Sequence, residues 1–235
     1  MYLMLREHRK TEKGVYTMAY IYYPSCKFTA FSPESSAAIS KILKERYGFI
    51  IADCCRPGHK ELTAADTAVT VCNTCAAICS EDSLAAGISL WEILDQDDAF
   101  PLPDYSREEM TLQDCWRAYD RPKLQDAVRS LLHKMNVTII EQEENREKTR
   151  FCGASLYMPL AKENGLYAPH RFIENAQGFF IPHTKEEQQT LMKEHCAKIY
   201  TDKVVCYCVP CTKGIRMGGK QGIHLLDLIL RNITK

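Results

Sequence analysis

The fold is decided by the stretch Ile50-Ile51-Ala52-Asp53-Cys54-Cys55-Arg56-Pro57-Gly58 and by a second stretch shortly after it, Val69-Thr70-Val71-Cys72-Asn73-Thr74-Cys75. Each passes from a short apolar run into cysteine, and an apolar run between polar or turn residues is typical of a buried strand. Ligands of an open parallel sheet bind at the edge formed by the carboxyl ends of its strands. We therefore expect these thiols to meet at such an edge and to bind a metal centre, with iron–sulfur as the leading interpretation.

A further strand and a helix precede these stretches. Residues 16–23 are rich in aromatic and β-favouring residues, which predicts a strand, and Cys26 follows its end. Pro33 suits the first position of a helix, with Ser32 before it as N-cap, and Gly48 is the expected end of that helix. The order strand, helix, strand predicts a right-handed crossover between parallel strands.

The second half of the chain repeats this pattern. Aligning Cys26 with Cys115 without gaps puts Pro33 on Pro122 and residues 50–51 on residues 139–140. Likewise, residues 87–94 resemble residues 222–229, each segment following a CxxC motif. The sequence therefore predicts an α/β fold of two pseudo-symmetric strand–helix–strand repeats, with mainly parallel sheets and cysteines at their carboxyl edges.

These matches also set the expected domain boundaries. We place an N-terminal arm at residues 1–15, the first repeat at 16–100 and the second repeat at 106–235. The acidic, proline-bearing segment 95–105 is expected to link the repeats. The second repeat carries a long aromatic-bearing insertion at 154–184, and such segments are often functional lids, although this one could also simply pack.

Composition narrows the classes of function. The chain has 30 basic and 30 acidic residues, so no excess of positive charge indicates nucleic-acid binding. No apolar run is long enough to span a membrane, and the first residues, with charges after a very short apolar patch, are the reverse of a secretory signal. We expect a cytoplasmic protein. Because the cytosol keeps thiols reduced, the 12 cysteines indicate metal or redox chemistry rather than disulfides.

With these motifs, the chain resembles the CCG family of cysteine-rich proteins, which includes the CCG-bearing subunit of heterodisulfide reductase and the iron–sulfur protein of lactate utilisation. The family pattern is a cysteine after the first strand, then Cys-Cys-Gly, then CxxC, usually occurring twice. The resemblance covers nearly all of residues 16–232 and implies two ligand sets: Cys26, Cys54, Cys55, Cys72 and Cys75 in the first repeat, and Cys115, Cys152, Cys208 and Cys211 in the second.

The resemblance also implies the cofactor. It is one or two [4Fe–4S] clusters, with the noncubane type at the first site, held by soft thiolates that suit iron. Two departures from the family pattern are visible. Phe151 stands where the second repeat would have its first adjacent cysteine, so Cys206 is a candidate substitute ligand. Arg56 follows Cys54-Cys55 in place of the family's glycine.

For function, the resemblance implies an iron–sulfur redox protein. It would transfer electrons, and could reduce a thiol-derived disulfide, as a subunit of an oxidoreductase complex with a flavoprotein or another iron–sulfur protein. The main alternative is a zinc-binding structural or interaction protein on the same fold. A metal-free dithiol shuttle through Cys72 and Cys75, and inert burial, also stay open. No catalytic residue is assigned: Cys79 and Cys196 are expected in the core, and His59 in a solvated loop.

Overall fold

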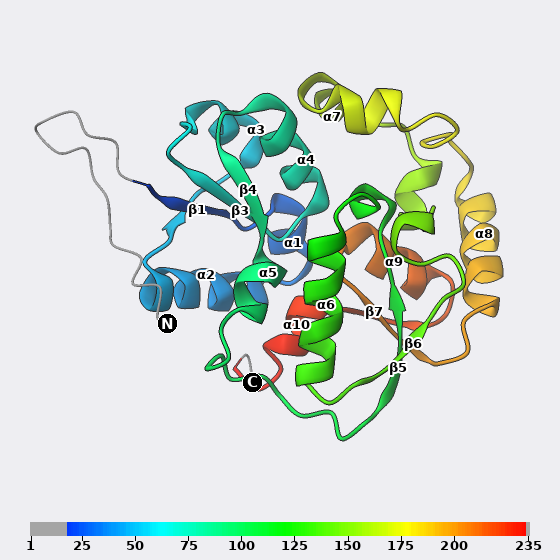
Figure 1. Ribbon diagram of the computed structural model, residues 1–235. Coiled ribbons are helices and arrows are strands. Elements are labelled where there is room, and N and C mark those ends of the chain that lie inside the picture. Colours follow the sequence, from blue (N-terminus) through cyan, green and yellow to red (C-terminus); the bar gives the residue numbers. More distant parts are fainter. Residues whose placement is uncertain (1–17, 234–235) are drawn as a thin grey trace, which may run out of the picture.

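The computed structural model describes residues 18–233 and contains two four-stranded sheets with helices around them (Figure 1). The strand orders are β2-β1-β3-β4 and β6-β5-β7-β8, and every pairing is parallel. The α/β class and the two parallel repeats are therefore confirmed. The expected arm at residues 1–15 lies outside the described residues.

The first half begins with the expected strand and helix. Pro33 occupies the first turn of α2, and Gly48 ends that helix with φ 69°, a conformation that favours glycine. Two short helices were not predicted, one starting at Cys26 and one at Cys55. The elements are β1 (Tyr20–Tyr23), α1 (Cys26–Phe31), α2 (Pro33–Tyr47), β2 (Ile50–Ile51), α3 (Cys55–Gly58), η1 (His59–Glu61), β3 (Thr67–Thr70), α4 (Asn73–Asp82), β4 (Ala86–Ser89) and α5 (Leu90–Asp95).

The second half follows the same order, but more helices lie between its second and third strands, including the 13-residue α8. Pro122 again starts the helix after the first strand. The elements are β5 (Glu109–Gln113), η2 (Trp116–Ala118), α6 (Pro122–Lys134), β6 (Thr138–Glu141), η3 (Arg146–Lys148), η4 (Gly153–Tyr157), α7 (Lys162–Tyr167), η5 (His170–Glu174), α8 (Lys185–Ala197), β7 (Lys203–Cys206), α9 (Val209–Met217), β8 (Gln221–His224) and α10 (Leu225–Ile229).

In both halves, the CxxC motif begins two residues after the end of a central strand. Strand β3 ends at Thr70, two residues before Cys72, and β7 ends at Cys206, two residues before Cys208. The two strands are therefore equivalent, with Cys206 matching Thr70. Cys206 was a candidate ligand because strand alternation would put its side chain on the same face as that of Cys208. Strand β7 ends at Cys206, so Cys208 lies outside the strand and this alternation does not apply.

The strand pairing fixes the equivalence of the two first strands. Tyr23 pairs with Thr70, and Gln113 pairs with Cys206, so Tyr23 is equivalent to Gln113. Two residues further on, the residue equivalent to Cys115 is therefore Ser25. The gapless alignment of Cys26 with Cys115 is wrong by one residue in the strands, because the connections around α2 and α6 differ in length.

At the other end of each repeat, the predicted match is confirmed. Ser89 pairs with Thr70 and His224 pairs with Cys206, so these two residues occupy equivalent places. Each accepts a hydrogen bond at the start of the following helix: Ser89 from the backbone of Glu92, and the ring of His224 from the backbone of Leu226. Different side chains therefore cap equivalent helices.

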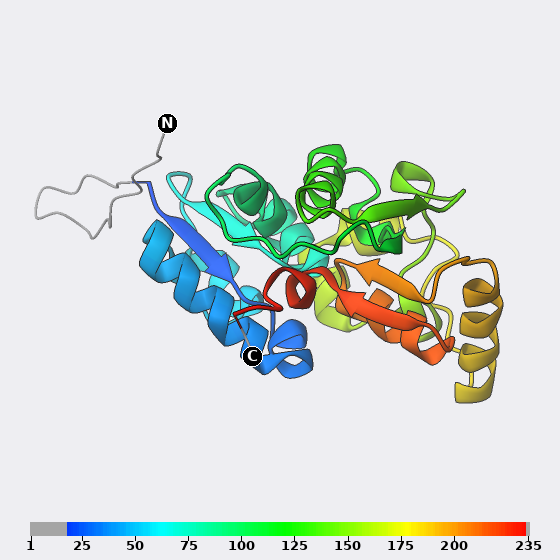
Figure 2. The same ribbon diagram turned by 90° about the horizontal axis from the view of Figure 1, so that it is seen from below.

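The two halves share one hydrophobic core and pack closely (Figure 2). Helix α5 of the first half packs against α6 of the second, as Figure 1 shows. The ring of His224 lies 4.5 Å from that of Phe28. The hydroxyl of Tyr105 donates to the carbonyl of Leu228 at 2.8 Å. Among the described helices, none combines the length and the apolar character needed to cross a membrane.

Candidate metal centre

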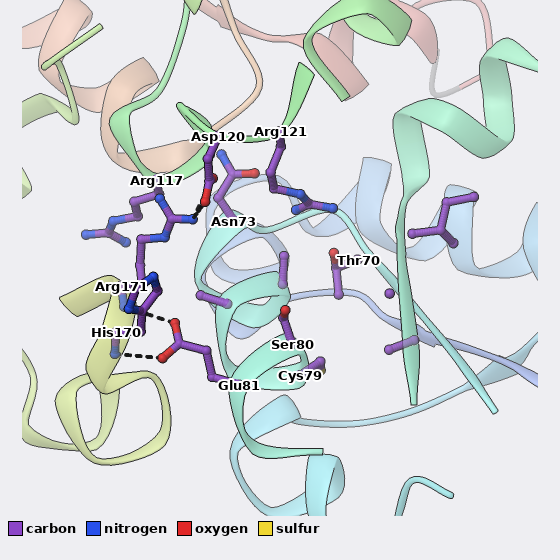
Figure 3. A pocket seen from close by; sticks show the side chains of 15 residues that line it. Thr70, Asn73, Cys79, Ser80, Glu81, Arg117, Asp120, Arg121, His170 and Arg171 are labelled. Atoms are coloured by element: carbon purple, nitrogen blue, oxygen red, sulfur yellow. Dashed lines mark hydrogen bonds and ion pairs between the residues drawn. The ribbon is translucent and has the colours of Figure 1, made fainter. Parts of the chain in front are cut away.

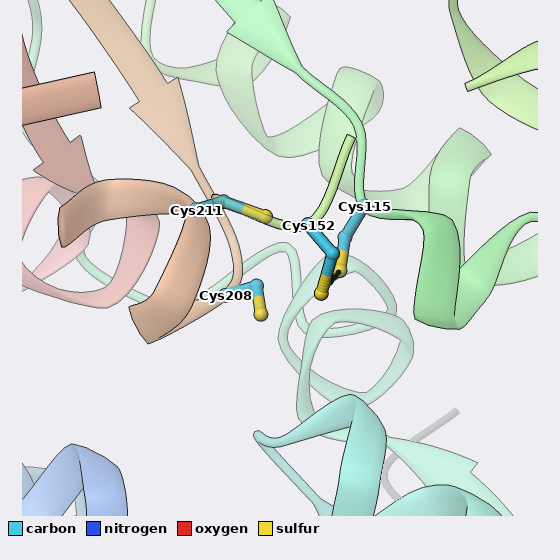
Figure 4. Close-up of side chains that lie close together, drawn as sticks. All are labelled: Cys115, Cys152, Cys208 and Cys211. Atoms are coloured by element: carbon cyan, nitrogen blue, oxygen red, sulfur yellow. Dashed lines mark hydrogen bonds between the residues drawn. The ribbon is translucent and has the colours of Figure 1, made fainter. Parts of the chain in front are cut away.

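Four cysteines of the second half lie close enough together to hold one metal ion (Figure 4). The sulfur atoms of Cys115, Cys152, Cys208 and Cys211 all lie within 4.8 Å of one another, and all four residues are buried. Within residues 18–233, this is the one group of three or more potential metal-ligating side chains whose ligand atoms lie that close together. It contains the whole ligand set predicted for the second repeat.

Three separate segments bring these thiols together. Cys115 follows β5 by two residues, and Cys208 follows β7 by two residues, so both stand at the carboxyl edge of adjacent parallel strands. Cys211 lies in the first turn of α9, one helical turn after Cys208, as the CxxC spacing requires. Cys152 comes from the loop between η3 and η4 and directly precedes η4. The sheet edge thus supplies three ligands and a long connection supplies the fourth.

Gly153 explains how the loop reaches the centre. It has φ 59°, and a Cβ built on it would lie 1.9 Å from the carbonyl oxygen of Pro210, in the first turn of α9. Gly214, one turn further along α9, also lies too close for a side chain, since its Cβ would lie 2.6 Å from the Cα of Gly153. Two glycines therefore let the loop bearing Cys152 lie directly against the helix bearing Cys211.

The spacing of the sulfur atoms fits a single tetrahedral ion. With metal–sulfur bonds of about 2.3 Å, tetrahedral geometry places neighbouring sulfurs about 3.8 Å apart. The sulfurs of Cys115 and Cys152 are 3.8 Å apart. Four thiolates on a cubane cluster bind four different irons and must lie further apart than thiolates on one ion. Four soft sulfur ligands suit zinc or iron and do not suit magnesium or calcium.

Arg117 supplies the positive charge next to the centre. Its side chain is buried and donates to the hydroxyl of Thr74 at 2.6 Å and to that of Ser155 at 3.1 Å. Burial alone would lower the pKa of Arg117, but nearby thiolates outweigh burial and raise this pKa above its ordinary value. The cysteines that have this effect when deprotonated are Cys152, Cys208, Cys115 and Cys72. Both halves therefore place sulfur near one guanidinium group.

The thiols of Cys115, Cys152 and Cys211 differ in their affinity for a proton. Hydrogen bonds from Cys115, Cys208 and Cys211 hold the pKa of Cys152 well below its usual value. Burial raises the pKa of Cys115 and of Cys211 well above it. Of these three thiols, Cys152, which lies beside Arg117, therefore loses its proton most readily. A bound metal ion would displace the remaining protons, so metal affinity should increase with pH.

Further hydrogen bonds orient the ligands. The backbone N–H of Cys115 donates to the hydroxyl of Tyr207 at 3.1 Å, and that hydroxyl donates to Asp114 at 2.9 Å. Asp114 is held by Arg129 at 2.7 Å. On the other side, the hydroxyl of Ser155 lies 3.5 Å from the sulfur of Cys152. Such contacts tune the affinity and potential of a bound metal.

The first half forms a less complete thiol set. Cys75 is hydrogen-bonded to Cys55 and to Cys72, and these contacts raise its pKa well above the usual value. The pKa of Cys72 lies well below it, because of hydrogen bonds from Cys75 and, among others, from the hydroxyl of Ser25. Ser25 therefore stands beside these thiols in the place that Cys115 occupies in the second half.

The other two predicted ligands of the first half, Cys26 and Cys54, lie outside this thiol set. Cys26 is exposed at the first residue of α1, and Cys54 is half-buried directly before α3. The structure thus brings Cys55 and Cys72 into hydrogen-bond contact with the thiol of Cys75. It does not gather three ligand atoms of the predicted first set within 4.8 Å of one another, as it does in the second half.

Some residues were placed wrongly or missed from sequence. His59 is buried rather than solvated, because its ring bridges the carbonyl of Cys55 at 2.7 Å and the carboxylate of Asp82 at 2.8 Å. Cys79 and Cys196 are buried as expected. Arg117 and Ser25 were not predicted, and only their positions within two residues of the strand-end cysteines Cys115 and Cys26 could have drawn attention to them.

Comparison of the chain with protein-family models, with curated proteins and with solved structures finds no match.

Proposed function

We propose that this chain is an iron-containing redox protein of the CCG type, which passes electrons to or from a partner protein. The observation that carries the proposal is that the buried guanidinium of Arg117 lies near thiols of both repeats, Cys72 of the first and Cys115, Cys152 and Cys208 of the second. A purely structural metal site needs only one set. Bound iron would supply one-electron transfer, and Arg117 would balance the negative charge of the thiolates.

The proposal extends to compartment and partner. All 12 cysteines are free thiols, which suits a reducing compartment such as the cytoplasm. The resemblance to the CCG family favours a flavoprotein or another iron–sulfur subunit as the partner. A thiol or disulfide metabolite is the corresponding small-molecule substrate. At the second-half centre, Cys115, Cys152, Cys208 and Cys211 would hold single iron at the sulfur spacing of this structure, and a [4Fe–4S] cluster only if the four sulfurs moved apart.

The second candidate function is that of a zinc-binding structural protein. It is favoured by the 3.8 Å separation of the Cys115 and Cys152 sulfurs, which matches a single tetrahedral ion. It is also favoured by the burial of all four ligands, since closed four-cysteine sites are typical of structural zinc. In that case the ion would stabilise the contact between α9 and the loop that carries Cys152.

The metal content of anaerobically purified protein separates these functions. Iron with inorganic sulfide and visible absorption supports a cluster, and iron without sulfide supports a single redox-active ion. Zinc at one per chain in a colourless sample supports the structural function. In each case, Cys208→Ser should lose the metal, while Cys206→Ser, a buried thiol two residues away outside the group, should retain it. Protein without metal that also fails to take up iron or zinc would contradict both functions.

A further inference from the structure

A second site lies in a cavity of about 320 Å³ that is lined by both halves of the molecule (Figure 3). One wall is helix α4, which contributes Asn73 and Ser80. Facing it are Arg121, from the start of the second-half helix α6, and Arg171, from η5. The volume is at the lower end of the range for small-molecule sites. The cavity has an exposed rim that includes Ser80, while Asn73 and Arg171 are buried.

Hydrogen-bond donors in this cavity lack partners. Within the described part of the chain, Nη1 of Arg121, Nε and Nη1 of Arg171 and Nδ2 of Asn73 are buried and have no hydrogen-bond acceptor. Buried donors without an acceptor are rare in native proteins, because each costs the free energy of its lost hydration. Donors from three separate segments that line one cavity indicate a ligand rich in acceptor atoms.

The carboxylates of the cavity are already engaged. Asp120 accepts from Nη2 of Arg171 with both oxygens at 2.5 Å. Glu81 accepts from the backbone N–H groups of His170 and Arg171, at 2.8 and 3.0 Å. Neither carboxylate is hydrogen-bonded to Nη1 of Arg121. The remaining donors are therefore available to an anion from outside the chain.

We propose that this cavity binds a small molecule through a carboxylate or phosphate group. Arg121 and Arg171 would donate charge-assisted hydrogen bonds to its oxygens, since arginine suits the geometry of both groups. The amide of Asn73 would supply a further donor. This site is independent of the metal: it uses none of the four metal-ligating cysteines. Arg117 lines the cavity and also donates to Ser155 beside Cys152, so an occupied cavity would lie next to the metal centre.

Titration of the full chain with inorganic phosphate and with succinate, at constant ionic strength set by chloride, tests this site. We expect saturable binding of one of the two in calorimetry, and which one binds distinguishes a phosphate-bearing from a carboxylate-bearing ligand. Arg121→Gln should weaken that binding by about tenfold to a hundredfold, as expected for loss of a charge-assisted hydrogen bond. Arg46→Gln, which removes an arginine paired with Asp97 away from the cavity, should not change it.

A second variant tests the same site if Arg121→Gln does not fold. Asn73→Asp keeps the size of the side chain but adds negative charge to the cavity, and it should also abolish anion binding. Circular dichroism and the thermal midpoint report whether each variant is folded. Saturable binding that is unchanged in folded Arg121→Gln and Asn73→Asp would overturn the proposal. Absence of saturable binding of either anion to the wild-type chain would overturn it as well.

Discussion

Ser25→Cys should create a second metal site in the first half. Strand pairing makes Ser25 the equivalent of Cys115, and the Ser25 hydroxyl is hydrogen-bonded to the thiol of Cys72. A thiol at this position would join Cys55, Cys72 and Cys75 to give four sulfur ligands, as in the second half. The metal retained after gel filtration should rise from one ion to two per chain.

The same change should raise thermal stability in the presence of metal. At free zinc about 100 times the dissociation constant of the new site, binding adds about 2.7 kcal/mol to the free energy of unfolding. For a chain of this length, 1 kcal/mol shifts the melting temperature by about 2–4 °C, so the additional rise is about 5–11 °C. The assay is calorimetry with and without zinc, comparing Ser25→Cys with wild type.

Cys26→Ser is the matched control for this experiment. Cys26 is exposed at the start of α1, so its loss should change neither metal content nor melting temperature. Loss of metal in Cys26→Ser, together with no gain of metal in Ser25→Cys, would refute the equivalence of Ser25 and Cys115. That result would make Cys26 the ligand, as the gapless alignment of the repeats predicts.

Three further predictions concern charge, backbone and pH. Arg117→Met removes the buried cation next to the thiolates, so the pH midpoint of zinc loading should rise by about 1–3 units, as measured by competition with a chelator. An unchanged midpoint, or an equal shift in Arg46→Met, would contradict this. Gly153→Ala should destabilise the protein by about 4 kcal/mol or more in urea unfolding, since its Cβ would lie 1.9 Å from a carbonyl oxygen. Gly178→Ala, with φ 79° but open space around the Cβ, is its control and should cost only about 1 kcal/mol; equal costs would contradict the contact. Burial lowers the pKa of His224 to about 3, so this ring stays neutral in the folded protein. As pH falls from about 6.5 toward 3, the ring gains a proton only in the unfolded chain, and the free energy of unfolding therefore decreases. His224→Asn, which keeps a helix cap, should therefore reduce the slope of unfolding free energy against pH between about 4 and 5.5 by about 1.4 kcal/mol per pH unit; an unchanged slope would show that the ring titrates normally.

The repeats could be predicted from sequence because their ends carry strong signals. At Ser89 and His224, the last strand of each repeat passes directly into the following helix, with the same spacing in both repeats. The predicted match of residues 87–94 with residues 222–229 is therefore correct to the residue. Around α2 and α6 the connections differ in length, and apolar periodicity tolerates a shift of one residue. The matched cysteines at 26 and 115 therefore gave a plausible but wrong register.

Features that depend on distant contacts could not be predicted. Arg117 has its role because Thr74 comes from the other half of the molecule. His59 is buried because Asp82, on α4, meets its ring. For Ser25, a hydroxyl just before a helix is an ordinary N-cap, and it does cap α1 by accepting from the backbone N–H of Phe28. Only the strand pairing shows that this serine also stands in a ligand position.

The loop held against α9 by Gly153 has a consequence for biosynthesis. The ligands of the second half appear in the order Cys115, Cys152, Cys208 and Cys211, and the last two flank the start of α9. During synthesis, Cys115 and Cys152 are translated first, and the set of four thiols is incomplete until most of the second repeat has been translated. A metal ion would therefore find its full ligand set only after α9, which carries Cys211, has been translated.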